Sequence, residues 1–61
     1  MERWVLATIH DTTPRGVYIN LSIATTMERM DDHTVVRFAD GTNFEVVEEP
    51  LHLIRNIIKQ P

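Results

Sequence analysis

The 61-residue chain contains no cysteine, so no disulfide can staple its fold. Only two glycines and three prolines interrupt it, and no apolar run approaches the roughly 18 residues that a membrane-spanning helix needs. Basic residues are also few, with six lysines and arginines against nine aspartates and glutamates. This balance disfavours non-specific attraction to nucleic acid or to an anionic membrane, because both require a positive field.

The length of the chain leaves room for one small domain, residues 1–61. A core of this size rarely supplies more than about 3–5 kcal/mol of stability, and domains of this size usually add a disulfide, a metal or a partner subunit. We therefore expect a homo-oligomer, or a chain that docks on a protein partner. The first ten residues lack a long apolar secretion segment, so we expect a cytoplasmic protein with no membrane contact.

The residues that are abundant favour strands. Six valines, six isoleucines and seven threonines are β-branched, and most of them precede residue 50. We expect a mainly β fold with about five short antiparallel strands, in a bent sheet or a partly open SH3-like barrel, and one C-terminal amphipathic helix. The strands are expected over 3–9, over two segments of 16–30, over 34–39 and over 42–48.

Local signals set the boundaries of these elements. The alternation weakens over 20–24, which predicts a bend or bulge there; a short helix over 21–30 is the alternative. Asp40-Gly41 predicts a hairpin with a type I′ turn. The segment 51–58 has an apolar stripe at helical spacing after Pro50, a residue that is tolerated in a first helical turn. The expected core contains Val5, Leu6, Ile19, Ile23, Val36, Phe38, Phe44, Val46, Leu51, Ile54 and Ile58.

No group of residues has the spacing of a catalytic or metal site, so we predict a non-enzymatic protein without a cofactor. His10-Asp11 and Asp31-Asp32-His33 contain metal-ligand types, but the histidines stand 23 and 19 residues apart and each group also suits a solvated turn. Ser22, the lone serine, lacks the Gly-x-Ser-x-Gly context of a nucleophile.

Charged residues leave two further interpretations open. Glu45, Glu48 and Glu49 would dock a basic partner or, as we prefer, complement the dipole at the start of the helix. A nucleic-acid-binding small barrel is the alternative function, with stacking on aromatic rings beside basic side chains. We disfavour it because the arginines are scattered. The residues in this interpretation are Arg3, Arg15, Arg29, Arg37 and Arg55, with Trp4, Tyr18 and Phe38.

The sheet and the helix offer two apolar faces in a chain too short to bury both, which favours an interaction or regulatory module. We predict that Trp4, Leu53 and Ile57 form its interface.

One family resemblance supports a non-catalytic role. Three segments, 17–23, 34–41 and 46–49, follow a pattern of Asn within an apolar strand, a polar-Gly hairpin and Val-Val-Glu before a helix. This pattern resembles the small flagellar and swarming-motility proteins of the FlbD type over about two thirds of the chain. The chain departs from the family at Trp4, at Pro14 in a longer first loop and at Glu49-Pro50. The resemblance implies a small cytoplasmic accessory protein and assigns no catalytic residue.

Overall fold

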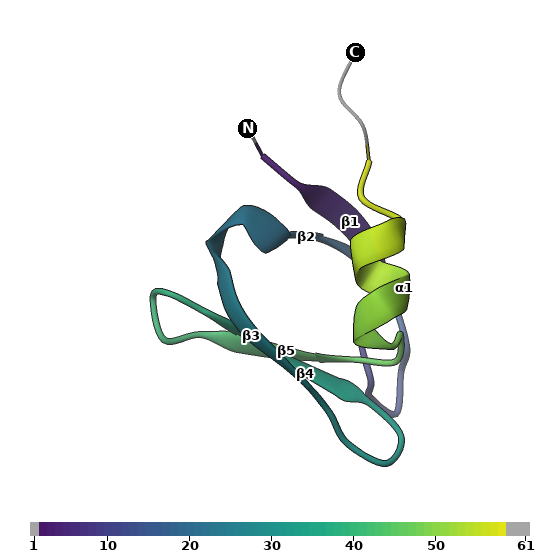
Figure 1. Ribbon diagram of the computed structural model, residues 1–61. Coiled ribbons are helices and arrows are strands. Elements are labelled where there is room, and N and C mark those ends of the chain that lie inside the picture. Colours follow the sequence, from purple (N-terminus) through teal and green to yellow (C-terminus); the bar gives the residue numbers. More distant parts are fainter. Residues whose placement is uncertain (1, 59–61) are drawn as a thin grey trace.

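The computed structural model describes residues 2–58, and its elements follow the expected order (Figure 1). Five antiparallel strands form two open sheets, β1–β2 and β3–β4–β5, and the described strands do not close into a barrel. The mainly β class is therefore confirmed. The strands are β1 (Trp4–Thr8), β2 (Gly16–Asn20), β3 (Ala24–Arg29), β4 (Thr34–Phe38) and β5 (Asn43–Val46), and the helix is α1 (Pro50–Arg55).

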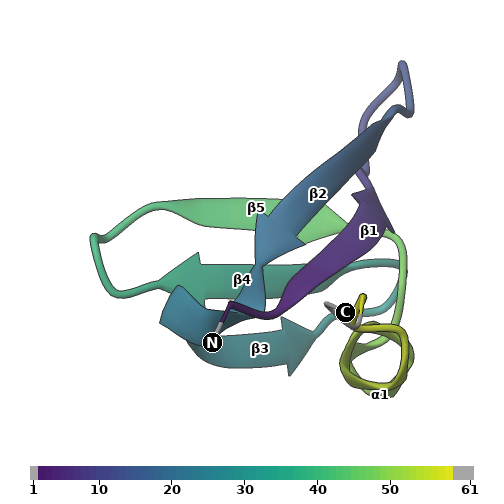
Figure 2. The same ribbon diagram turned by 90° about the horizontal axis from the view of Figure 1, so that it is seen from above.

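The β1–β2 ribbon lies across the three-stranded sheet, and α1 lies beside both (Figure 2). The two sheets meet where β1 ends. Ile9 forms an isolated antiparallel bridge with Val46, and the amide of Val47 donates to the carbonyl of Thr8 at 2.9 Å. This connection sets the angle between the sheets and makes the sharply bent arrangement that the sequence predicts.

A 3-10 turn over Leu21–Ile23 joins β2 to β3 and confirms the expected bend. The side chain of Asn20 caps this turn by accepting a hydrogen bond from the amide of Ser22 at 3.0 Å. The alternative of a helix over 21–30 is wrong, because β3 occupies most of that segment and pairs with β4. Threonines in β3 favour the pleated conformation over a helix.

The hairpin at Asp40-Gly41 lies where it was predicted, but its turn is not type I′. That turn needs positive φ at both central residues, and among the described residues only Gly41 has it, at 91°. The amide of Gly41 donates to the carbonyl of Phe38, and the amide of Phe38 donates to the carbonyl of Thr42. These bonds define a three-residue loop that ends in a left-handed glycine, a geometry typical of a type I turn followed by a bulge.

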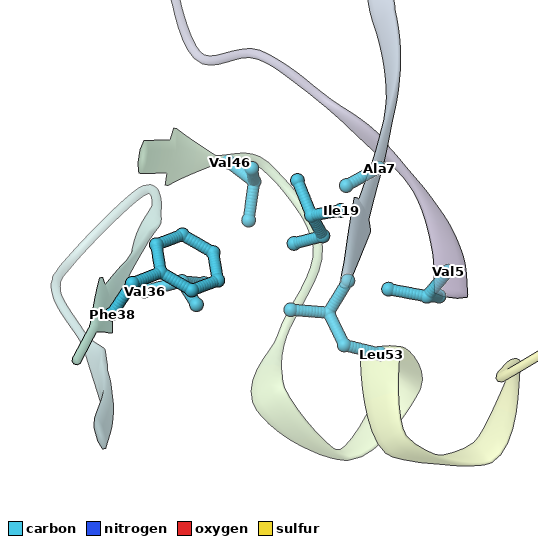
Figure 3. Packing of buried hydrophobic residues seen from close by; sticks show 7 residues of the cluster. All are labelled: Val5, Ala7, Ile19, Val36, Phe38, Val46 and Leu53. Atoms are coloured by element: carbon cyan, nitrogen blue, oxygen red, sulfur yellow. The ribbon is translucent and has the colours of Figure 1, made fainter. Parts of the chain in front are cut away.

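The core lies between the two sheets and α1, and Figure 3 shows Leu53 reaching from α1 toward Val5 and Ile19. Five expected core residues are buried, and Ala7 and Leu53 join them. The other six expected core residues are exposed. Three of them belong to the predicted helix, but the observed α1 ends at Arg55 and buries only Leu53. Leu6 alternates with the buried Val5 and Ala7 along β1 and therefore lies on the opposite face of that strand. The buried cluster is Val5, Ala7, Ile19, Val36, Phe38, Val46 and Leu53. The exposed exceptions are Leu6, Ile23, Phe44, Leu51, Ile54 and Ile58.

A polar junction, defined by Thr8, Arg29, Thr34 and Glu48, ties the sheets together beside this core. The Glu48 carboxylate accepts hydrogen bonds from the amide and the hydroxyl of Thr8, both at 2.8 Å. The hydroxyl of Thr34, which is fully buried, donates to the carbonyl of Glu48 at 2.7 Å and accepts from Arg29. Burial opposes ionisation of Glu48, but the bonds from Thr8 outweigh it and lower the pKa of the carboxyl.

Candidate interaction surface

An open, mainly apolar groove lies between β2 and the β4–β5 hairpin, with a volume of about 260 Å³. We call it the aromatic groove, because every aromatic residue of the sequence lines it: one tryptophan, one tyrosine and two phenylalanines. Trp4 and Tyr18 come from the ribbon, and Phe38 and Phe44 come from the hairpin. The full lining is Trp4, Tyr18, Ile19, Asn20, Ile23, Phe38, Asp40, Thr42 and Phe44.

The two phenylalanine rings make an edge-to-face contact, with centroids 5.8 Å apart and planes at 80°. Phe38 is 7% exposed and belongs to the core, whereas Phe44 is 42% exposed. Tyr18 of β2 and Ile23 of the 3-10 turn, which also line the groove, are 61% and 52% exposed. The inner end of the groove therefore lies against the core. Its outer part is lined by large side chains that the described part of the chain leaves exposed.

The free edge of β2 belongs to the same surface. In the described residues β2 pairs with β1 alone, in the register that sets Tyr18 opposite Leu6 and Ile19 opposite Val5. None of the described strands lies beside the other edge of β2, and three β2 residues line the groove. An unpaired strand edge beside an apolar groove is the arrangement that accepts an added strand.

Four polar side chains of the groove form hydrogen bonds with neighbouring residues: Trp4, Asn20, Asp40 and Thr42. Asp40 accepts hydrogen bonds from the side chain and the amide of Thr42, which lower the pKa of its carboxyl. The indole nitrogen of Trp4 donates to Glu2 at 2.6 Å, and Asn20 caps the 3-10 turn. Since the described lining contains one carboxylate and no basic side chain, the groove is apolar with a slight negative charge.

The arginines lie away from this groove, which weakens the nucleic-acid interpretation. Arg37 contacts Glu28 at 3.1 Å, Arg15 lies 3.9 Å from Asp11, and Arg29 belongs to the polar junction. Thus the structure brings the aromatic rings together without the positive charges that phosphates require.

The three predicted interface residues do not share one surface. Trp4 is half-buried in the wall of the aromatic groove. Ile57 is half-buried in a second groove of about 290 Å³ that lies between α1 and β3. Leu53 is fully buried in the chain's own core, so its prediction as a contact for a partner is corrected. The apolar stripe of the helix could not reveal which of its members faces the sheet.

The acidic stretch also divides between separate roles. Glu48 is part of the polar junction, and Glu49 is the N-terminal cap residue of α1 without a side-chain capping bond. Glu45 lies 3.5 Å from the ring of His33. The three carboxylates therefore do not form a single docking patch. The dipole interpretation suits Glu49 by position, whereas Glu48 acts by fixing β1 to the loop before α1.

The fold brings together two clusters of histidine and aspartate that are distant in the sequence. His10 follows β1, and Asp32-His33 lies in the turn between β3 and β4, yet the two imidazole rings stack with centroids 4.7 Å apart. Asp32 contacts both rings, and its hydrogen bond with His33 lowers the pKa of its carboxyl. Spacing along the sequence could not show this contact, because the bend at 20–24 and the Ile9–Val46 bridge create it.

Comparisons with protein-family models, with curated proteins and with solved structures find no match for this chain. The flagellar-type resemblance therefore stays a prediction. Among the described residues, no helix has both the length and the apolar character that crossing a bilayer demands.

Proposed function

We propose that this chain is a small cytoplasmic, non-enzymatic interaction module that self-associates through the aromatic groove and the edge of β2. The observation that carries the proposal is the gathering of all four aromatic residues on one open groove. Aromatic side chains concentrate at protein interfaces because they bury a large apolar area with few rotatable bonds.

The groove leaves apolar side-chain area exposed to water, and association would bury it. Tyr18, Ile23 and Phe44 are each between 42% and 61% exposed, and they lie around a single hollow. Burial of a large apolar side chain contributes about 1.5–3 kcal/mol. Covering these three side chains adds a stabilisation comparable with that of the whole core of so small a domain.

We infer that the partner on this surface is a second copy of the chain. A two-fold arrangement brings two identical patches together, and antiparallel pairing of β2 with its copy is compatible with such symmetry. An interface of ordinary size covers about 800 Å² on each partner. That is about a fifth of the 4439 Å² surface of this chain, so one face suffices.

Light scattering coupled to size-exclusion chromatography tests the proposal with a matched pair of variants. Tyr18→Asp puts a charge in the groove, and Leu51→Asp puts the same charge at a similarly exposed site on α1 that lines neither groove. We expect a dimer for the unmodified chain and for Leu51→Asp, and a monomer for Tyr18→Asp. A monomer for all three proteins at about 100 µM would contradict the proposal.

The nucleic-acid alternative is separated by a titration with single-stranded RNA and DNA at about 50 mM salt, where electrostatic attraction is strong. Trp4 fluorescence is the natural signal, because Trp4 is the single tryptophan and lines the groove. We expect no quenching, because the described lining holds no basic residue. Saturable quenching would favour nucleic-acid binding through stacked bases.

A further inference from the structure

Three side chains of metal-ligand type, His10, Asp32 and His33, lie close together where the two sheets meet. Unlike the aromatic groove, this cluster is polar. His10 is held there by its backbone, since its amide donates to the carbonyl of Glu45 at 2.9 Å. Asp32 and His33 lie in the β3–β4 turn, which the bond from the amide of Met30 to the carbonyl of His33 closes at 2.8 Å. Two fixed backbone segments therefore present these side chains to each other.

The donor atoms of His10, Asp32 and His33 are close enough for one ion. A nitrogen from each ring and an oxygen of Asp32 all lie within 4.8 Å of one another. Asp32 Oδ1 is 2.7 Å from His33 Nδ1, and Asp32 Oδ2 is 3.5 Å from His10 Nε2. Tetrahedral zinc with bonds of about 2.0–2.2 Å holds its ligands roughly 3.3–3.6 Å apart, so adjustments of about 1 Å bring the three donors into range.

Glu45 supplies the orienting contact that histidine ligands usually have. Its Oε1 lies 3.5 Å from His33 Nε2, on the side of the ring away from the Asp32 contact. Zinc binding at His33 Nδ1 displaces the proton of the hydrogen bond to Asp32, and Glu45 then accepts the proton that remains on Nε2. His33 is 19% exposed in its side chain, so this ring is held in place by its surroundings as well as by Glu45.

One of the two imidazole rings must rotate before a nitrogen of His10 and a nitrogen of His33 can bind the same ion. The imidazoles are stacked with an interplanar angle of 8°, and lone pairs in parallel planes do not converge. His10 is the ring with freedom to turn, because its side chain is 36% exposed. Asp32 is 69% exposed and adjusts easily within its turn.

We propose that His10, Asp32 and His33 form a zinc-binding site that links the end of β1 to the β3–β4 turn. Imidazole and carboxylate donors suit zinc, and three protein ligands leave the fourth tetrahedral position to water. Bound zinc cross-links segments more than 20 residues apart in a chain that has no cysteine. The site thus provides the staple that domains of this size commonly use.

Calorimetric titration of the untagged protein with Zn²⁺ tests the site, together with thermal unfolding followed by circular dichroism. We expect one zinc ion per chain and a rise in Tm of at least about 4 °C at ten times the dissociation constant. His10→Gln should weaken binding at least tenfold. His52→Gln is the matched control, because His52 is the third histidine and lies on exposed α1 outside the cluster. Mg²⁺, which prefers oxygen donors, should leave Tm unchanged.

Two readouts keep the proposal falsifiable if His10→Gln folds poorly. Asp32→Asn changes an exposed turn residue and should also weaken zinc binding. The ring proton signals of His10 and His33, observed by NMR, should both shift on zinc addition as the stack opens, whereas those of His52 should not. Absence of zinc binding, binding that the Asp32 and His10 variants retain, or equal loss in His52→Gln would overturn the site.

Discussion

The core and the aromatic groove are adjacent apolar regions with different composition and exposure, since the core is mainly aliphatic and the groove holds all four aromatic residues. The core buries seven side chains to 7% exposure or less, whereas three side chains around the aromatic groove are more than 40% exposed. Phe38 and Phe44 join the two regions, because their rings touch while one belongs to the core and the other to the groove. The core therefore determines the fold of the chain, while the groove keeps large apolar side chains at the surface, where the proposed self-association would bury them.

The largest expected effect comes from the core. Leu53→Ala removes the one side chain by which α1 is anchored, and it should lower the free energy of unfolding by about 2–5 kcal/mol. That loss is comparable with the total stability of a domain of this size. Urea denaturation followed by circular dichroism measures it. Ile54→Ala, at the exposed next position, is the control and should cost less than about 1 kcal/mol; equal losses would erase the distinction between the two regions.

The second-largest loss of stability is expected from a change in the polar junction. Glu48→Gln weakens both bonds from Thr8 and should lower the free energy of unfolding by about 1.5–3 kcal/mol near pH 7. Because the pKa of Glu48 is lowered in the folded chain, its contribution is complete above the unfolded-state pKa and is lost as the pH falls through the folded-state pKa.

The unmodified chain should therefore lose more stability between about pH 6 and pH 3 than Glu48→Gln does. Parallel urea titrations at several pH values give this difference. Glu49→Gln is the control, because the side chain of Glu49 makes no capping bond. If the stability of Glu48→Gln falls with pH as much as that of the unmodified chain, Glu48 makes no pH-dependent contribution to stability.

A smaller effect is expected at the hairpin tip beside the groove. Gly41 has φ of 91°, and an added Cβ would meet no heavy atom within 4 Å. Gly41→Ala should therefore cost only the left-handed backbone penalty, about 1–2 kcal/mol, in thermal or urea unfolding. A cost near zero would mean that the loop adopts another turn without loss.

The smallest effect on folding is expected in the groove itself. Tyr18→Asp should change the free energy of unfolding of the monomer by less than about 0.5 kcal/mol, because Tyr18 is 61% exposed. Urea denaturation measures this effect. A chain concentration of about 1 µM favours the monomer, so that the measurement excludes the contribution of self-association. A loss as large as that of Leu53→Ala would place Tyr18 in the folding core and remove the contrast between the regions.

Local sequence patterns predicted most of the architecture. Alternation of apolar residues located the strands, Asp40-Gly41 located the hairpin, and the weak pattern over 20–24 located the bend. These features depend on neighbours in the chain, so the sequence displays them directly. The turn type was missed because Asp40 and Gly41 suit two hairpin geometries, and the hydrogen bonds of Phe38 select between them.

Features set by contacts distant in sequence were not predicted. The stripe predicted over 51–58 contains five apolar residues, of which three lie in α1, yet docking against two sheets buries Leu53 alone among the helical residues. Likewise His10 and His33 meet only because the bend and the sheet junction bring their segments together. The aromatic groove has the same origin, since its rings come from both the ribbon and the hairpin.

The most direct test of self-association through the groove is a series of two-dimensional amide NMR spectra at chain concentrations from about 10 µM to 1 mM. If the chain self-associates through the groove, the amide signals of β2 and Phe44 and the indole signal of Trp4 should shift with concentration. The amide signals of α1 should stay unchanged. Spectra that are identical at all concentrations, or shifts confined to α1, would contradict self-association through the groove.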